Sequence, residues 1–315
     1  MPSHPRNTHA VVVGAGTMGA DVAVVLARGG CSHVTVVDTR ADQREQLAAR
    51  VLSGLQPLGM GDRAARVQVA ASLQDVSWDP VVLVIECITE QLVAKQALFA
   101  ELLKFAPVHT LLTSNSSGIP ISAIAHGLPT QERMLGLHFF MPAHLVPLVE
   151  VVMGPNSQPE QAARLSDYMR GCGSVPVLVR KDKPGFLANR LQHALSREAF
   201  AMIDEGIASP QDVDAAVRFG FGFRFLAAGP VLQRDHAGLE VHCAAAATIY
   251  PSLCNTTEPS QALQTRVAQG HLGLKSGEGF YAWTPEQIAA ERLRYNTLLQ
   301  QGLALLASDL PPLDA

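Results

Sequence analysis

The stretch HAVVVGAGTMG, residues 9–19, decides the fold of this chain. An apolar run, residues 9–14, ends at a glycine, and residues 17–29 then have the spacing of a helix. The turn between them is a G-x-G-x-x-G loop made of Gly14, Gly16, Thr17, Met18 and Gly19. The first glycine of such a loop allows a tight turn, the second admits a pyrophosphate, and the third lets helix and strand pack closely. Between a strand and a helix, this pattern predicts a dinucleotide site at the helix N-terminus.

Strands and helices alternate along the chain after this loop. The residues VVLVIE, 81–86, are apolar almost without interruption, which is typical of a strand buried on both faces of a parallel sheet. Further strands are expected at 33–38, 109–114, 136–140, 148–152 and 175–180, and helices at 41–56 and 91–106. The alternation predicts an α/β fold class, with an N-terminal Rossmann-type doubly wound parallel sheet.

Helical spacing takes over after KDKPG, residues 181–185. Ser209 and Thr284 each precede a proline and are expected to cap the start of a helix. We therefore expect two domains, a nucleotide-binding Rossmann domain over residues 1–182 and an all-α C-terminal domain over residues 183–315.

Composition excludes several classes of protein. The 315 residues are 48% hydrophobic and 17% charged, with a net charge of −4 and no basic run, so a nucleic-acid partner is not expected. Apolar runs are far shorter than the ~20 residues of a membrane helix, and no signal peptide is expected. Five scattered cysteines without a CxxC pair indicate buried thiols in a reducing cytoplasm.

Asp38 ends the second expected strand, nineteen residues after Gly19. A carboxylate at this place can bind both ribose hydroxyls of NAD and would repel the 2′-phosphate of NADP. Arg40 lies close by and weakens this preference slightly. The expected cofactor is NAD.

The stretch HFFMPAHLVPLVE, 138–150, places an imidazole and a carboxylate between two expected strands. Pro142 and Pro147 exclude a helix between them, so the chain could return Glu150 to the side of His138. A carboxylate fixes the tautomer of a neighbouring imidazole, whose other nitrogen can then take a proton from a substrate hydroxyl as hydride leaves the same carbon. Spacing alone leaves open an unrelated pair of a surface histidine and a strand glutamate.

Two further patterns bear on the site. The turn SNSSG, 114–118, follows a strand whose carboxyl end faces the ligand crevice of a doubly wound sheet, although such turns are common. His138 and His144 are six residues apart, but no cysteine or carboxylate set completes a metal site, and no metal is expected.

Six motifs in sequence order resemble the L-3-hydroxyacyl-CoA dehydrogenase superfamily, from residue 8 to about residue 283. They are VVVGAGTMG, VIECITEQLVAKQALFAEL, TSNSSGIPIS, GLHFFMPAHLVPLVEVV, KDKPGFLANRL and GLKSGEGFYAW. The resemblance implies an NAD-binding Rossmann domain, a helical domain that forms a homodimer, and a place in fatty acid metabolism. It implies catalytic roles for His138, Glu150, Ser117 and Asn189, with Ser117 and Asn189 holding the substrate oxygen. The implied NAD contacts are the glycine loop, Asp38, Glu90, Lys95 and Asn115.

The chain departs from this pattern in three places. The histidine motif of acyl-CoA enzymes usually reads HFFNP, and Met141 stands here in place of the asparagine. The segment 56–80 is shorter than the helical hairpin of acyl-CoA members and contains no lysine for the CoA phosphates. The segment 190–230 resembles the branch with lambda-crystallin (L-gulonate 3-dehydrogenase) and carnitine dehydrogenase, where Arg224 would bind a substrate carboxylate. Alternatively, Arg224 makes a surface or dimer salt bridge.

We therefore expect an NAD-dependent, 3-hydroxyacyl-CoA dehydrogenase-like oxidoreductase with a His/Glu dyad as base. The first alternative is a dehydrogenase of a small free hydroxy acid whose carboxylate is held by Arg224. The second is a non-catalytic, crystallin-like NAD-binding protein, which the presence of all four catalytic residue types disfavours.

Overall fold

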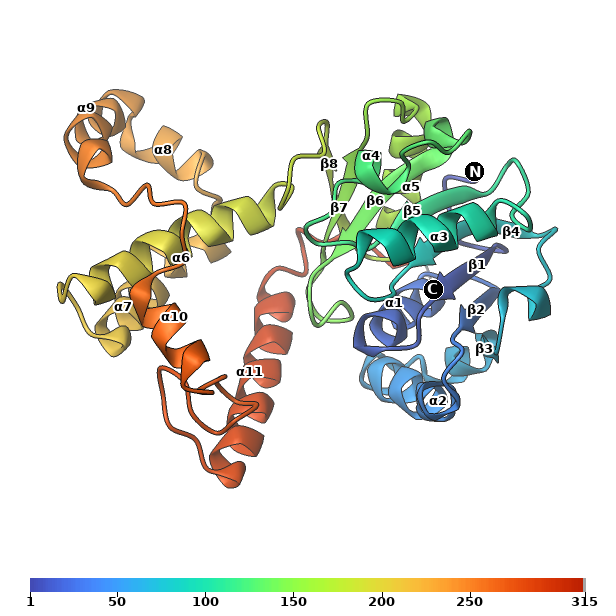
Figure 1. Cartoon of the computed structure of the whole chain (residues 1–315), viewed down its shortest axis with the longest axis horizontal. Helices are drawn as coiled ribbons and strands as arrows, with labels where there is room; N and C mark the ends of the chain where they lie inside the picture. Colours follow the sequence, from blue (N-terminus) through green and yellow to red (C-terminus); the bar gives the residue numbers. More distant parts are fainter. Residues whose placement is uncertain (314–315) are drawn as a thin grey trace. The chain divides into compact units, whose positions relative to one another are not determined.

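The strand before the glycine loop, β1 (His9–Val13), lies inside an eight-stranded sheet of order β3-β2-β1-β4-β5-β6-β7-β8 in the computed structural model, which describes residues 1–313 (Figure 1). Neighbouring strands are parallel except β6 and β7, which are antiparallel. The other strands are β2 (His33–Val37), β3 (Val67–Ala70), β4 (Val81–Glu86), β5 (Leu111–Ser114), β6 (Met134–Phe139), β7 (Leu148–Met153) and β8 (Val175–Val179). This is the predicted doubly wound sheet.

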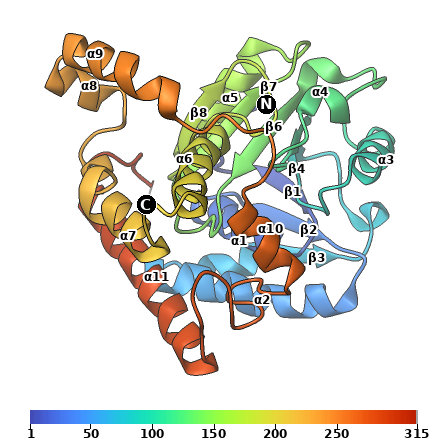
Figure 2. The same ribbon diagram turned by 60° about the vertical axis from the view of Figure 1, so that its left-hand side comes forward.

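Two apolar cores cover the two faces of the sheet, because successive side chains of a strand point to opposite faces. Ala10 and Val12 of β1 pack into the core that also contains residues of α1 (Thr17–Arg28), α2 (Ala41–Leu55) and α5 (Pro159–Gly171). Val11 and Val13 pack into the core formed with α3 (Leu92–Leu102) and α4 (Ile121–Ile124) (Figure 2). Both faces of the central strands are therefore buried against apolar side chains.

Short 3₁₀ turns complete this part of the chain. They are η1 (Gln56–Leu58), η2 (Gly61–Arg66), η3 (Leu73–Asp75) and η4 (Gln131–Arg133). No helix among residues 1–313 is long and apolar enough to cross a bilayer.

The chain divides into two compact units, one from Met1 to Arg190 with the segment from Ala307 onward, and one over Leu191–Leu306. The second unit is helical, as predicted. Its elements are the rest of α6 (Ala188–Asp204), α7 (Pro210–Ala216), η5 (Val217–Phe221), η6 (Phe223–Leu226), α8 (Leu232–Ala237), α9 (Leu239–Ile249), η7 (Tyr250–Ser252), α10 (Gln261–Ala268) and α11 (Pro285–Leu305). The assignment of cofactor binding to residues 1–182 and of substrate binding and dimerisation to residues 183–315 stays a prediction.

Both predicted helix caps are present. The Ser209 hydroxyl accepts a hydrogen bond from the Asp212 N–H, and the Thr284 hydroxyl accepts one from the Gln287 N–H. Gln287 returns its side-chain oxygen to the Thr284 N–H, which completes a capping box.

Among the strands and α-helices of residues 1–187, β3, α4 and α5 were not predicted, and the interpretation of the cysteines was wrong. β3 is only four residues long with a mostly exposed face, so its pattern is weak, whereas α5 buries residues at helical spacing that the sequence already displayed. Cys31 and Cys172 are buried thiols, but Cys243 is exposed on α9, so the cysteines are not uniformly buried.

Candidate active site

His138 and Glu150 lie directly opposite each other on the antiparallel strands β6 and β7. The His138 Nδ1 is 2.7 Å from the Glu150 Oε2, and both side chains are buried. The twelve-residue separation in sequence is therefore the return path of one hairpin. This is the pairing that the two strand patterns allowed.

Glu150 is held from a second side by the start of α6. Its Oε1 accepts the backbone N–H groups of Leu187 (3.0 Å) and Ala188 (2.7 Å). A fully buried carboxylate needs such donors, and the N-terminus of a helix adds a favourable partial positive charge. The carboxylate is thus fixed in place while it holds the imidazole.

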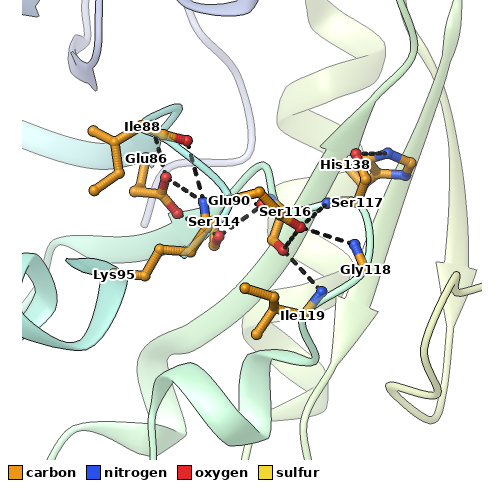
Figure 3. Close-up of polar contacts among 10 residues, drawn as sticks. All are labelled: Glu86, Ile88, Glu90, Lys95, Ser114, Ser116, Ser117, Gly118, Ile119 and His138. Atoms are coloured by element: carbon orange, nitrogen blue, oxygen red, sulfur yellow. Dashed lines mark hydrogen bonds and ion pairs between the residues drawn. The ribbon is translucent and has the colours of Figure 1, made fainter. Parts of the chain in front are cut away.

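The hydrogen bonds of His138 assign its tautomer. A carboxylate only accepts, so Nδ1 carries the proton that is donated to Glu150. The Nε2 is then free to accept, and it lies 3.1 Å from the hydroxyl of Ser117, an exposed residue at the turn after β5 (Figure 3). In this tautomer the Nε2 can accept a proton from a hydroxyl that replaces or joins Ser117, and the role of His138 as the base stays a prediction.

Two aromatic rings support the imidazole edge-on. The ring of Phe140 lies 4.5 Å and that of Phe186 5.6 Å from the His138 ring, centroid to centroid. Phe186 is buried and has a φ of 49°, in the left-handed region that is uncommon for a bulky residue. The turn before α6 therefore places a ring against the histidine and then presents the helix N–H groups to Glu150.

Asn115 also follows β5. Its Oδ1 accepts the backbone N–H of Phe139 at 2.8 Å, which ties the end of β6 to the turn that carries Ser117. The side-chain NH₂ group remains available to a ligand, so a contact with NAD stays a prediction.

The glycine loop leaves room for a ligand at one position only. A Cβ at Gly14, whose φ is 107°, would lie 2.7 Å from the Cys87 carbonyl oxygen, and one at Gly19 would lie 1.7 Å from the Gly14 oxygen. A Cβ at Gly16 would meet nothing within 4 Å. Packing within the protein thus requires two glycines, and the third opens the space that a pyrophosphate needs.

The helix after this loop begins at Thr17, so the N–H groups of Thr17 and Met18 are among the first four, which have no acceptor within a helix. Asp38 follows β2 and accepts the N–H of Ala15 at 2.7 Å through its Oδ2. Its carboxylate is thereby held beside the loop where the ribose of NAD is expected. The guanidinium of Arg40 is paired with Asp42 at 2.6 Å. The carboxylate of Asp42 would therefore compete with the 2′-phosphate of NADP for this guanidinium.

Glu90 and Lys95 lie together beside the same edge of the sheet. The Lys95 Nζ is 2.7 Å from the Glu86 Oε1 and 3.3 Å from the Glu90 Oε2. Partial burial disfavours the charged form of Glu90, but hydrogen bonds from Ser116 and Gly118 and the nearby Lys95 outweigh it, so the pKa of Glu90 is lowered. The structure brings both residues to the site region, and their contact with NAD stays a prediction.

The side chains of Asn189 and Arg224 make no hydrogen bond or ion pair among residues 1–313. Asn189 lies in the first turn of α6, next to Ala188, and its side chain makes no hydrogen bond within residues 1–313. Arg224 lies in η6 of the second unit, exposed and without an ion pair among those residues. The roles of both in substrate binding stay predictions.

Sequence reasoning missed three residues of this region. Glu86 is a buried carboxylate at the end of an apolar strand, which is itself a signal, because an isolated charge there needs a partner. Phe186 had no signal beyond the glycine before it. Asp21 of α1 accepts the N–H of Ala143 at 2.9 Å and lies 3.0 Å from the His144 ring, so it ties the β6–β7 connection to the nucleotide helix.

Comparison with known proteins identifies the family of this chain. The model of the 3-hydroxyacyl-CoA dehydrogenase NAD-binding domain matches residues 9–183, and that of the 3-hydroxyacyl-CoA dehydrogenase C-terminal domain matches residues 185–283. The chain belongs to the 3-hydroxyacyl-CoA dehydrogenase family. Homologues are named NAD-dependent dehydrogenases, and NAD is the cofactor of this family. That the glycine loop and Asp38 bind it stays a prediction.

Individual members of the 3-hydroxyacyl-CoA dehydrogenase family differ in substrate. A 5-formyl-3-hydroxy-2-methylpyridine 4-carboxylate 5-dehydrogenase of Mesorhizobium japonicum is 32% identical over 90% of this chain and 94% of its own. A solved structure of an enzyme of this name, described as an NAD+-dependent dismutase, has a TM-score of 0.87, with 30% identity over 95% of this chain and 98% of its own. The mitochondrial hydroxyacyl-coenzyme A dehydrogenase of Homo sapiens is 33% identical over 87% of this chain and 91% of its own.

Proposed function

We propose that this chain is an NAD-dependent dehydrogenase that oxidises a CH–OH group on a small free carboxylic acid, with His138 as the base. NAD, when bound, accepts the hydride. His138 Nε2 takes the hydroxyl proton, and Glu150 stabilises the imidazolium that results. Ser117 and Asn189 hold the substrate oxygen, Ser117 from its position 3.1 Å from the base.

One observation carries the choice of a free acid. The segment 56–80 contains two cations, Arg63 and Arg66, and both line a surface cavity of about 330 Å³. The cavity is lined by Arg6, Asn7, Gly29, Gly30, Ser32, Arg63 and Arg66. Asn7 and Ser32 precede β1 and β2, so the cavity lies at the amino ends of these strands, whereas nucleotides bind at the carboxyl ends.

Arg63 and Arg66 therefore lie at the amino ends of the strands, whereas a coenzyme A ester that reaches His138 would lie at the opposite edge of the sheet. A five-residue strand separates the two edges by roughly 16 Å. The Arg63 guanidinium also donates to the Arg28 carbonyl at the end of α1, which is a structural task. The segment supplies no cation for CoA phosphates beside His138.

The name of the Mesorhizobium relative is a second, independent argument for a free acid as substrate. Its name describes a pyridine carboxylate that carries a formyl group. The hydrate of a formyl group has a CH–OH, and the same base and hydride acceptor oxidise it to a carboxylate. A small aromatic acid with a hydroxyl or formyl group is thus the substrate class that we propose.

Arg224 is proposed to bind the substrate carboxylate, since a guanidinium offers two parallel donors to it. Arg224→Met should then raise the KM for the acid by about tenfold or more, the worth of a charge-assisted pair of ~1.5–3 kcal/mol, while NAD affinity is unchanged. Arg218→Met is the matched control, because the Arg218 guanidinium already lies over the Phe219 ring at 5.2 Å. An unchanged KM in Arg224→Met would remove Arg224 from the substrate site.

Oxidation of a 3-hydroxyacyl-CoA is the second candidate, and the human relative named as a hydroxyacyl-coenzyme A dehydrogenase favours it. Free coenzyme A distinguishes the two. An enzyme that binds the CoA phosphates is inhibited competitively by free coenzyme A. We expect no inhibition at millimolar concentration, and competitive inhibition would support the acyl-CoA substrate.

A further inference from the structure

Three arginines line the surface cavity at the amino ends of β1 and β2. The cavity has a volume of about 330 Å³, and its lining includes Arg6, which precedes β1, and Arg63 and Arg66 of η2. No aspartate or glutamate of the described residues lines it. Its volume is at the small end of the range of about 300–1,000 Å³ that is typical of small-molecule sites. The charges around it favour an anion as the ligand.

Arg66 is the arginine of this cavity whose head group has no structural contact. Its side chain is half-buried, and within residues 1–313 it makes no hydrogen bond or ion pair. Burial raises the pKa of the Cys31 thiol, and the charge of Arg66 acts in the opposite direction, so the guanidinium lies near this buried residue. A cation that is drawn toward the protein interior needs a partner, and an anion in the cavity would supply one.

Arg63 has a structural contact and keeps donors for a ligand. Its Nη1 donates a hydrogen bond to the Arg28 carbonyl at the end of α1. A guanidinium carries five N–H groups, so four remain for water or for a bound anion. Arg63 therefore fixes η2 on α1 and still contributes a positive charge to the cavity.

Arg6 reaches the cavity from the segment before β1. Gly29 and Gly30, which follow α1, also line the cavity, and a Cβ added at Gly30 would lie 3.9 Å from the Arg6 Cγ. Gly30 has a φ of 90°, in the left-handed region that favours glycine. Because neither glycine has a side chain, the space that the arginines border stays open.

The end of α1 leaves only the guanidinium groups to bind an anion. The backbone N–H groups of residues 29–31 are already bound to carbonyl oxygens of α1. The carbonyl end of a helix also carries a partial negative charge that repels anions. A single carboxylate would gain little here, because solvent weakens its pairing with a partly exposed cation. A group with nearly two negative charges and three free oxygens can pair with more than one guanidinium.

We propose that this cavity is a binding site for a phosphate group, held by Arg6, Arg63 and Arg66. Two N–H groups of a guanidinium match two phosphate oxygens, which is why arginine suits this ligand. The cavity lies at the amino ends of the strands, whereas NAD is expected at the carboxyl ends, so the phosphate is not that of the cofactor. The site does not depend on the proposed dehydrogenase function.

The test uses the full-length protein with NAD in excess, so that the glycine loop cannot take up the probe. Inorganic phosphate and glycerol 3-phosphate are titrated by calorimetry at constant ionic strength, and acetate is the monovalent anion for comparison. Arg66→Met is the test variant, because it removes a charge without breaking a hydrogen bond of the protein. Arg292→Met, on α11, is the matched control, since Arg292 also has no ion pair within residues 1–313.

The unmodified protein should bind at least one of the two phosphate compounds with a millimolar or lower Kd and should not bind acetate measurably. Arg66→Met should weaken this binding by about tenfold or more, because it removes one charge-assisted pair. Arg292→Met should leave the Kd within twofold of the unmodified protein. Arg6→Met gives a second, independent loss of affinity, and thermal unfolding checks that every variant folds.

Vesicles of phosphatidylcholine with and without phosphatidic acid show whether a lipid can carry the phosphate group. Binding to phosphatidic acid that is lost in Arg66→Met, without binding of the free compounds, would identify a lipid headgroup as the ligand of this site. Binding of the free compounds alone would identify a soluble phosphate. An equal Kd in Arg66→Met and the unmodified protein, or no binding of any phosphate probe at about 10 mM, would overturn the proposal.

Discussion

Glu150 is the residue that fixes the tautomer of the neutral His138 ring. One of its oxygens accepts from the imidazole and the other accepts from the first N–H groups of α6. Because the carboxylate cannot donate, the neutral imidazole carries its proton on Nδ1 and leaves Nε2 unprotonated. The proposed base is therefore held by Glu150 in the tautomer that can accept a proton at Nε2.

Replacement of Glu150 by glutamine should reverse this tautomer. The amide oxygen would remain with the α6 N–H groups, and the amide NH₂ would donate to Nδ1, so the ring proton would move to Nε2. We expect Glu150→Gln to lower kcat by roughly 10²–10⁴-fold with little change in the temperature of unfolding. His138→Ala should cost about the same, and the double variant should cost no more than either, measured as initial rates at saturating NAD. Additive losses would mean that the two residues act separately.

At the scale of secondary-structure elements, the register of the hairpin β6–β7 places His138 opposite Glu150. The strand patterns and prolines predicted that Glu150 could return to His138, because register follows once two strands and a stiff connection are recognised. The contacts of Glu150 with Leu187 and Ala188 could not be predicted, since they depend on how α6 approaches the sheet.

In the turn between β1 and α1, packing requires a glycine at position 19, whereas we expect that the cofactor requires the glycine at position 16. Gly16 has a φ of −65°, and a Cβ there meets nothing, so Gly16→Ala should leave unfolding unchanged to within about 1 kcal/mol. It should nevertheless weaken NAD binding by about tenfold or more, because the methyl group occupies the pyrophosphate space.

Gly19→Ala is the matched contrast. The added Cβ would lie 1.7 Å from the Gly14 oxygen, so backbone must move, and a loss of roughly 1–3 kcal/mol in unfolding free energy is expected. Urea unfolding and NAD titration of both variants measure these effects. Equal NAD affinity in Gly16→Ala and the unmodified protein would place the cofactor elsewhere.

The helical unit, considered as a whole, lacks a core of its own. Across residues 191–306, Val213 and Ala262 are the only apolar side chains that are buried, while Phe219, Val231 and Tyr250 are each at least 70% exposed. Apolar exposure on this scale marks an interaction surface. The homodimer that the family resemblance implies would cover it.

We therefore expect a dimer at micromolar concentration, by light scattering coupled to size exclusion. Serial dilution gives the dissociation constant. A monomer that stays folded and soluble across the same range would show that the helical unit is stable without a second copy.

We propose that the protein oxidises a small free acid rather than a CoA ester. The most direct measurement is kcat/KM for NAD reduction with 5-formyl-3-hydroxy-2-methylpyridine 4-carboxylate and with (S)-3-hydroxybutyryl-CoA, in one preparation of enzyme. We expect the free acid to be preferred by at least about 100-fold, which corresponds to ~2.7 kcal/mol, because the segment 56–80 supplies no cation for the CoA phosphates beside His138. A preference of the same size for the CoA ester would contradict it.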